Sequence, residues 1–397
     1  MTANAVHRQQ LFPFAALSAS YFAHIGFFNP YLPLWLKEAG YGLLAISVLT
    51  SVQSLTRLVA PYGWGWLSDH TGERVKLLRF CATSAMIISA ALWLKLSFAA
   101  LVLVLLLMFL NTSAMMPMSE AAMAHLVSQG GSFDPKKYGR VRLWGSMGFL
   151  LTVFAAGAWF EHFGLQDFPA WTVASLALVV LSVWRLPDLK EAHPAHTEAL
   201  PVWPVLRQAR VRWFFLALFF HVLSHMGIYV FFSLYLDELG YSKTMIGLLW
   251  AVSVIVEIGW FFTQSRWLPW LSARAWLVLC AGVMLVRMVI TFSAADVLVC
   301  LLVAQALHAI TFATHHSVCI ALVSEMFPGR LRGRGQALYT VLGYGLPGVL
   351  GGLAGGALSA SWGLVTVFQA AAVCAALGTV SAWCCWRTAR SRPSLNL

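Results

Sequence analysis

Five ionisable residues stand inside long apolar stretches of this chain, where a charge is costly. They are Arg57, Arg142, Arg287, Glu120 and Glu257. In hydrocarbon such groups usually face a cavity, are paired, and serve a proton, an ion or a charged solute. A carboxylate in a medium of low polarity holds its proton more tightly, whereas a nearby arginine favours the ionised form. A glutamate that alternates between these environments could therefore take up and release a proton.

Histidines at helical spacing add to this chemistry in the second half of the chain. His308 and His315 lie seven residues apart, which is two helical turns, with Thr311 between them. A second stripe repeats every four residues: His221, His225 and Tyr229. Each stripe either faces a cavity or is packed like ordinary buried polar groups. No acid joins the second stripe, so a metal site is not expected there.

An amide in the first apolar stretch is a candidate of another kind. Asn29 is followed by Pro30 and Pro33. Proline disturbs the regular pattern of helical hydrogen bonds. This pattern predicts a bent helix with a polar group near a cavity, or only a kink.

The composition requires that these residues be positioned by helices in lipid. The 397 residues are 60% hydrophobic and only 10% charged, against about 25% charged in soluble domains. The apolar runs exceed 18 residues, which is too long for barrel strands and suits membrane helices. Twelve such runs are expected, at 11–36, 42–66, 76–95, 98–127, 139–162, 168–186, 211–236, 243–267, 274–293, 296–326, 335–358 and 361–386.

Two segments 200 positions apart have nearly the same sequence. Residues 34–41 are LWLKEAGY and residues 234–241 are LYLDELGY, with five of eight positions identical. This repeat predicts an all-α membrane protein of twelve transmembrane helices in two pseudo-symmetric six-helix bundles. The bundles are expected at 1–186 and 211–397, with a cytoplasmic linker at 187–210, the one extended polar stretch.

Basic residues predict the orientation. With the N-terminus in the cytoplasm, 20 of the 26 basic residues lie on the cytoplasmic side and three on the other, leaving the three arginines within spans. That asymmetry follows the positive-inside rule and places both termini in the cytoplasm. It also explains the net charge of +11 by topology and anionic lipid, without nucleic-acid binding.

The loop after the second expected span, Gly65-Trp-Leu-Ser-Asp-His-Thr-Gly-Glu, resembles the signature loop of the major facilitator superfamily, Gly-x-x-x-Asp-Arg-x-Gly-Arg/Lys. His70 and Glu73 depart from that pattern. In the superfamily this loop braces spans during the conformational cycle, which implies that role for Gly65, Asp69 and Gly72. The alternative is an ordinary Asp/Gly turn.

A narrower resemblance lies in the fifth span. Its segment Gly-Arg-Val-Arg142-Leu-Trp-Gly resembles one shared by lactose permease and the phenylpropionate permeases. In lactose permease the second arginine binds substrate and pairs with a glutamate of span four. The resemblance implies these roles for Arg142 and Glu120, although Arg142 could instead be a charge at the cytoplasmic edge.

The resemblance extends to proton coupling in the second half. Lactose permease uses an acid on span eight, an arginine on span nine, and a histidine and an acid on span ten. Here Glu257, Arg287, His308 and His315 occupy similar places, but span ten has no acid at its middle because Glu325 lies near its end. This implies that Glu257 carries the proton. The alternative is a static structural pair of Glu257 and Arg287.

The repeat connects the two halves, since Arg57 corresponds to Glu257 at the offset of 200. We expect Arg57 to help hold an anionic solute while Glu257 handles the proton. Asn29 and His225 join Arg57, Glu120 and Arg142 as candidate substrate-binding residues.

Together these features predict a proton symporter that imports a small organic solute, with no cofactor, no metal and no enzymatic activity. Excess arginine in the spans favours a solute with a carboxylate, and the abundant aromatic residues could stack an aromatic ring. The resemblance to the phenylpropionate permeases implies an aromatic carboxylic acid such as 3-phenylpropionate. A sugar or nucleoside symporter is the alternative, and a drug exporter a weaker one. The expected partners are an organic anion, protons and lipid, for a monomer in a bacterial inner membrane.

Overall fold

The chain was analysed as a computed structural model that describes residues 3–127, 135–188 and 201–390. Among these residues the structure consists of helices and turns, without a strand. The helices of the first half are α1 (Ala3–Glu38), α2 (Leu43–Thr71), α3 (Arg74–Ser89), η1 (Ala90–Trp93), α4 (Phe98–Thr112), α5 (Met115–Val127), α6 (Pro135–Phe163), η2 (Leu165–Asp167) and α7 (Phe168–Trp184).

The remaining helices are α8 (Trp203–Leu206), α9 (Ala209–Met226), η3 (Gly227–Phe231), α10 (Phe232–Glu238), α11 (Lys243–Trp267), η4 (Leu268–Trp270), α12 (Ala273–Ser293), α13 (Leu298–Ala306), η5 (Ala309–Thr314), α14 (His315–Met326), η6 (Gly329–Leu331), α15 (Arg332–Thr340), η7 (Val341–Gly345), α16 (Leu346–Trp362) and α17 (Val365–Arg390).

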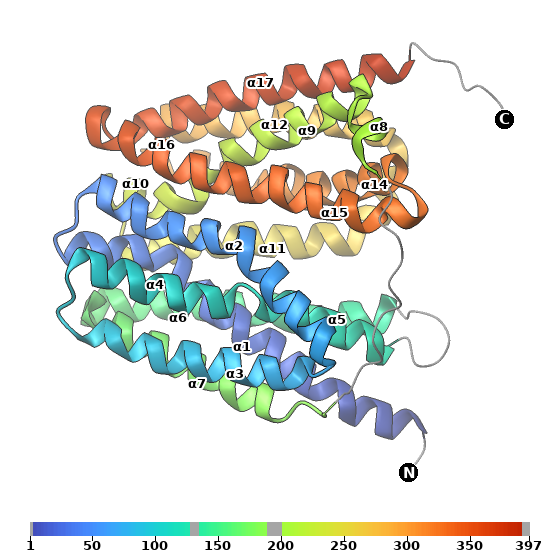
Figure 1. Ribbon diagram of the computed structural model, residues 1–397. Helices are drawn as coiled ribbons and strands as arrows, with labels where there is room; N and C mark the ends of the chain where they lie inside the picture. The colour runs from blue at the N-terminus through green and yellow to red at the C-terminus, as the bar shows by residue number, and fades with distance from the viewer. Residues whose placement is uncertain (1–2, 128–134, 189–200, 391–397) are drawn as a thin grey trace. The chain divides into compact units, whose positions relative to one another are not determined.

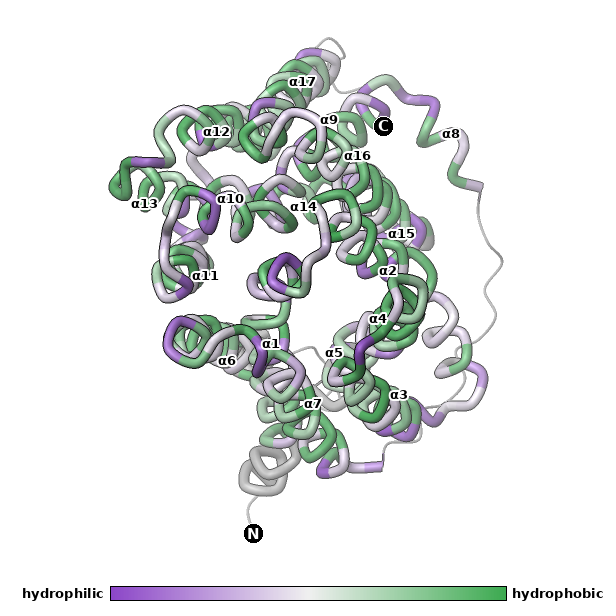
Figure 2. Tube along the Cα trace, turned by 90° about the vertical axis from the view of Figure 1, so that its left-hand side faces the viewer, coloured by the Kyte–Doolittle hydropathy of each residue, from purple (hydrophilic) through white to green (hydrophobic). Residues whose placement is uncertain are grey.

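In the part of the chain that the structure describes, twelve stretches of helix are long and apolar enough to cross a membrane, which confirms the predicted fold class. Hydrophobic residues run along the helices, and hydrophilic ones concentrate at turns and helix ends (Figure 2). The first span continues as one helix through Pro30 and Pro33. Three other spans, the seventh, tenth and eleventh, are interrupted by the π-helical turns η3, η5 and η7.

The sequence repeat is also a repeat of local structure. Gly40 and Gly240 both follow the first membrane span of their half with a positive φ, +89° and +84°. The tyrosine after each glycine donates its N–H to a carbonyl five residues earlier, at 3.1 Å for Tyr41 and 3.0 Å for Tyr241. Glycine adopts this backbone conformation without steric cost, and the return bond satisfies a terminal carbonyl of the helix.

The helices form two compact units. One comprises 1–41, 52–196 and 242–251, and the other comprises 42–51, 197–241 and 252–397. In the first unit α1 packs against α6 and α7, and α3 against α7; in the second, α9 packs against α16 and α17, and α12 against α17 (Figure 1). The two units therefore repeat the same set of helix pairs.

Glycines let α1 approach α6 closely in the first unit. A Cβ on Gly26 would lie 2.7 Å from the backbone oxygen of Phe149, and one on Gly148 would overlap the backbone of Ala19. Such contacts between backbones are possible only where the side chain is absent. This packing fixes the position of α1 relative to α6, the two helices that carry Asn29 and Arg142.

Candidate functional site

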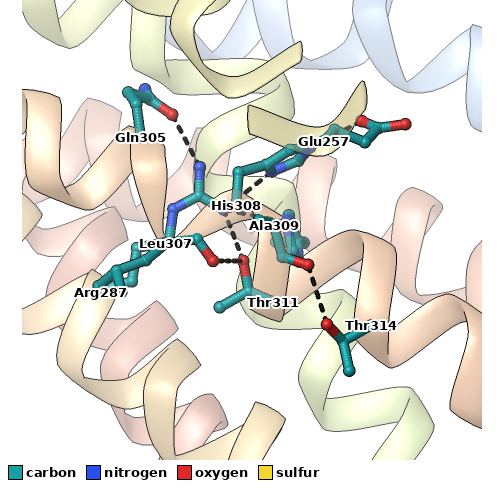
Figure 3. A network of polar contacts seen from close by, with 9 residues as sticks. Glu257, Arg287, Gln305, Leu307, His308, Ala309, Thr311 and Thr314 are labelled. Carbon is teal, nitrogen blue, oxygen red and sulfur yellow. Dashed lines mark hydrogen bonds and ion pairs between the residues drawn. The ribbon is translucent and has the colours of Figure 1, made fainter. Parts of the chain in front are cut away.

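The centre of the second unit is a buried arginine. Arg287 of α12 has no exposed surface. Its NH1 lies 3.2 Å from His225 Nε2 and 3.1 Å from His308 Nδ1, and donates to Thr311 Oγ1 at 3.0 Å. Its NH2 donates to Gln305 Oε1 at 2.8 Å (Figure 3). NH1 carries two hydrogens, so its three neighbours share them. No carboxylate among the described residues contacts this cation directly.

His308 connects the arginine to Glu257. Because a guanidinium nitrogen only donates, the His308 Nδ1 that faces it must accept, and the ring proton is then on Nε2. That Nε2 lies 3.4 Å from Oε2 of Glu257, whose side chain is 21% exposed. The geometry therefore places a neutral imidazole between a fully buried cation and a partly exposed carboxylate.

This arrangement differs from a direct Glu257–Arg287 pair, the alternative considered from the sequence. The glutamate reaches the arginine only through His308. Burying an arginine is costly unless its charge is balanced and its hydrogens are bonded. Here the balancing charge stands one ring away, and Arg287 Nε has no hydrogen-bond partner among the described residues. The charge on Glu257 therefore bears on how well the charge of the buried Arg287 is balanced.

A π-helical turn shapes this part of the tenth span. The turn η5 spans Ala309–Thr314, so His308 precedes it and His315 follows it. Thr311 lies within the turn; it accepts from Arg287 and donates to the carbonyl of Leu307 at 3.2 Å. Turns of this type widen the helix by one residue and are frequent at functional sites.

The other two histidines form a second contact between α9 and α14. His221 and His315 stack with their ring centres 3.7 Å apart and their planes 8° apart. His221 Nε2 lies 2.7 Å from the carbonyl of Thr311, and His315 contacts the sulfur of Cys319 at 3.5 Å. His315 does not contact Arg287. It stacks on His221, whose ring lies 5.6 Å from that of His225, a neighbour of Arg287. No group of three or more possible metal ligands occurs among the described residues.

In the first unit the structure brings Arg142 and Glu120 together. The NH1 of Arg142 on α6 forms an ion pair with Oε1 of Glu120 on α5. The arginine also lies over the ring of Phe22, with its guanidinium carbon 5.6 Å from the ring centre. Both charged side chains are partly exposed, at 48% and 32%, so they remain accessible to a solute.

Arg57 and Asn29 lie on neighbouring helices of the same unit. Asn29 Oδ1 accepts from Gln53 Nε2 at 3.1 Å, and Gln53 precedes Arg57 by one helical turn on α2. Arg57 is exposed and lies, with Glu120, within electrostatic reach of the Tyr21 hydroxyl. No ion pair or hydrogen bond joins Arg57 to another residue in the part of the chain that the structure describes.

The expected loop motif follows α2. Gly65 lies within that helix, and no other atom lies within 4 Å of the place where its Cβ would be. Gly72 ends the helix with φ +67°, and its N–H donates to the carbonyl of Ser68 at 2.8 Å. Arg74 Nε donates to Ser68 Oγ at 3.0 Å. The side chain of Asp69 lies outside the described residues, so its expected role is untouched by the structure.

Sequence reasoning missed two amides that contact candidate site residues. Gln305 binds Arg287 and is buried, and Gln53 binds Asn29. The spacing of each amide could have indicated it, because residues three or four apart lie on one face of a helix. Gln305 lies three residues before His308, and Gln53 lies four residues before Arg57. Uncharged residues in an apolar run give a weaker signal than charged ones, although they form the same kind of contact.

Comparisons with known proteins support a transport role. A family model described as the MFS_1-like family matches residues 16–370. A probable 3-phenylpropionic acid transporter of Escherichia coli (strain K12) is 27% identical over 333 residues, covering 82% of this chain and 85% of that protein. A maltose permease of Geobacillus stearothermophilus is 26% identical over 362 residues, covering 90% of each.

Solved structures agree in fold. The nucleoside transporter NupG superposes with a TM-score of 0.79 at 15% identity, covering 96% of this chain and 100% of NupG. A D-xylose–proton symporter gives a TM-score of 0.71 at 14% identity, covering 96% of this chain and 97% of that protein. At these identities the likeness concerns the arrangement of helices and not the solute.

Proposed function

We propose that this chain, which belongs to the MFS_1-like family, imports a small organic solute together with protons by alternating access. As a member of that family it is a multi-pass secondary transporter and not an enzyme. The solute we favour is an aromatic carboxylic acid such as 3-phenylpropionate. The transporter would lie in a bacterial inner membrane with both termini in the cytoplasm, act as a monomer, need no cofactor and be driven by the proton gradient.

The observation that carries this proposal is the chain of contacts from Arg287 through His308 to Glu257. While Glu257 is ionised, its charge offsets that of the buried arginine. When Glu257 takes up a proton, the arginine loses this offset and the site has an excess positive charge. An anionic solute then restores the balance, so proton and anion favour each other's binding.

Two further features support an aromatic carboxylate. Among the candidate residues of the first unit, Arg57 and Arg142 provide two cations against one acid, Glu120, and arginine binds carboxylates through paired hydrogen bonds. In the second unit, the Phe312 ring stacks on His308 with centres 5.0 Å apart and planes at 6°. A ring beside the charged network suits a solute whose carboxylate is attached to an aromatic group.

A sugar or nucleoside symporter is the second candidate. The maltose permease among the relatives and the amide pair of Asn29 and Gln53 favour it, because an amide offers both donors and acceptors to a hydroxyl group. This alternative predicts that uncharged glycosides compete for uptake, whereas the carboxylate proposal predicts that they do not.

The test is uptake of radiolabelled 3-phenylpropionate by proteoliposomes with an acidic exterior. Because the neutral acid also crosses lipid unaided and distributes with the pH gradient, initial rates are compared with those of protein-free liposomes. Saturable, protein-dependent uptake that a protonophore abolishes is the expected result. If no carboxylate is taken up faster than in protein-free liposomes, the proposal fails; inhibition by maltose or a nucleoside would favour the second candidate, and reduced accumulation a drug exporter.

A further inference from the structure

The fourth membrane span of each half is interrupted. In the first half, α4 ends at Thr112 and α5 begins at Met115, and Pro117 has no N–H for the carbonyl four residues earlier. In the second half, the interruption is the π-helical turn η5. An interrupted helix leaves backbone carbonyls without their regular partners, and in a bilayer such groups must be bonded by another part of the protein.

A side chain from the first span of each half bonds to a carbonyl at this interruption. In the first half, the Tyr21 hydroxyl donates to the carbonyl of Thr112 at 3.2 Å. In the second half, His221 Nε2 lies 2.7 Å from the carbonyl of Thr311. Tyr21 and His221 are 200 positions apart, which is the offset of the sequence repeat, and both are buried. The two halves therefore use the same position of the first span to support the fourth.

The ring of His221 is directed at η5. A carbonyl oxygen only accepts, so the ring proton of His221 is on Nε2 and its Nδ1 has the lone pair. That Nδ1 is buried and has no hydrogen-bond partner among the described residues, which is unfavourable. The ring also stacks on His315, which directly follows the turn. His221 thus contacts both the turn and the residue after it.

Thr311 connects the His221 bond to the buried arginine. Its carbonyl accepts from His221, and its hydroxyl accepts from Arg287 NH1 at 3.0 Å. Within the turn, Thr314 Oγ1 donates to the carbonyl of Ala309 at 3.1 Å, whereas the Thr311 carbonyl is bonded from α9. Every step from His221 to Arg287 is therefore a direct contact.

We propose that His221 is a positioning residue of the proton-coupling network, an inference that rests on the proposed function. Its Nε2–H bonds the Thr311 carbonyl and thereby holds the Thr311 hydroxyl at Arg287. The ionisable groups within electrostatic reach of its ring are His225 on the same helix, His315 after η5 and Arg287 on α12. The role requires neither these groups nor His221 itself to change charge.

Loss of this bond should weaken the coupling between proton and anion. Without a donor, the Thr311 carbonyl would be buried and unbonded, which the turn can avoid only by shifting. His308 directly precedes η5, so a shift of the turn also moves the ring that links Glu257 to Arg287. The charge on Glu257 would then be balanced less well against that of the arginine.

The test compares three variants of His221 with the unmodified transporter in proteoliposomes. His221→Phe keeps a ring for the stack on His315 but removes the N–H. His221→Gln removes the ring but keeps an N–H about as far from the backbone, and His221→Asn has the same amide on a shorter side chain. In the Phe and Asn variants pH-driven uptake should fall by about fivefold or more, the factor equivalent to one hydrogen bond, and His221→Gln should restore it to within about twofold. The affinity measured by counterflow should also change less with pH in the Phe and Asn variants than in the unmodified protein.

Tyr21→Phe is the matched control. It removes the equivalent bond of the first half and leaves the contacts of Arg287 in place. We expect a fall in Tm similar to that of His221→Phe, with an unchanged pH dependence of counterflow. A purely structural role of His221 would instead give the two phenylalanine variants the same pH dependence.

A measurement on the unmodified protein tests the bond without transport. The ¹⁵N NMR spectrum of histidine-labelled protein identifies the ring nitrogen that carries the proton, with the His221 resonances assigned through its backbone. His221 protonated at Nε2 is the expected result. Protonation at Nδ1 would overturn the inference, because that tautomer cannot donate to the Thr311 carbonyl, and this measurement decides if no variant folds.

The outcomes separate this inference from the proposed function. If the unmodified protein shows no pH-driven uptake, the proposed function fails, and the role of His221 in coupling fails with it. If the unmodified protein shows uptake and His221→Phe retains its pH dependence, only the inference about His221 is overturned. If His221→Gln is as defective as His221→Phe, it is overturned as well, because the ring and not its N–H would then be what the network needs.

Discussion

Replacing Glu257 with glutamine tests the central element of the proposed mechanism. Glutamine has the size of a protonated glutamate and keeps a carbonyl oxygen within reach of the His308 Nε2–H, which lies 3.4 Å from the native carboxylate. The substitution keeps residue 257 uncharged, as it would be after Glu257 takes up a proton in the proposed mechanism. We therefore expect the folded protein to lose less than about 1 kcal/mol of stability, the net worth of one neutral hydrogen bond.

The expected effect on transport follows from the number of carboxylates in the network. Among the described residues that contact Arg287 or His308, Glu257 is the one acid. The proposed coupling makes Glu257 the one proton carrier and so expects one proton per solute. Each pH unit would then contribute about 1.4 kcal/mol, and a gradient of about two units would favour uptake about 100-fold. In Glu257→Gln this contribution vanishes, and net uptake should fall to the rate of protein-free liposomes while exchange at equal pH persists.

The pH dependence of binding has a definite sign. The proposed coupling expects an anionic solute to bind the unmodified protein best when Glu257 is protonated, so its apparent affinity should weaken as the pH rises. In Glu257→Gln the arginine is always without an offsetting charge, and the affinity should not change with pH. Counterflow measured at several pH values gives both curves, and Glu238→Gln, an exposed position at the end of α10, serves as the control. Normal gradient-driven uptake by Glu257→Gln would refute the reasoning and place the proton elsewhere.

Four further substitutions test the first unit. Arg57→Gln should abolish carboxylate uptake without loss of folded protein in size-exclusion chromatography; undiminished uptake would remove Arg57 from the site. Glu120→Gln should lower thermal stability by less than about 1 kcal/mol, because its pair with Arg142 is partly exposed, and a large fall in Tm would indicate a structural pair instead. Gly26→Ala should destabilise by about 1–3 kcal/mol through its clash with α6, whereas Gly63→Ala, which meets no atom within 4 Å, should gain about 0.5–1 kcal/mol; equal Tm shifts would contradict this packing.

The fold could be predicted from the sequence because lipid leaves a helical chain few choices. Each apolar run is long enough to span the bilayer, and every backbone group must find a partner within its own helix. The repeat added the division of the helices, since the same glycine follows the first membrane span of each half: Gly40 and Gly240. The length and polarity of each span depend on local sequence alone, so the sequence predicts the twelve spans that the described residues form.

The contacts of the site depend on packing between distant segments, and the sequence indicated them less well. It indicated the charged residues and the histidines of the cluster but not their order, since His308 lies between Glu257 and Arg287. A helical pattern shows which residues share a face, but it does not show which face meets which neighbour. Gln305 illustrates the same limit, because its contact with Arg287 joins helices α12 and α13.

The π-helical turns distinguish the second half from its repeat in the first. All three in the described residues, η3, η5 and η7, belong to the second half. Each turn contains a residue with a hydroxyl group: Tyr229 in η3, Thr311 in η5 and Tyr344 in η7. An added residue in a turn rotates everything after it around the helix axis, so a duplicated scaffold acquires new side-chain contacts without a new fold. The Tyr344 hydroxyl lies 3.1 Å from that of Tyr339. The repeat position of Tyr344 is Trp144, an exposed residue of a regular helix, so this contact has no counterpart expected in the first half. The departures from helical regularity thus account for polar contacts that the second half has and its repeat lacks.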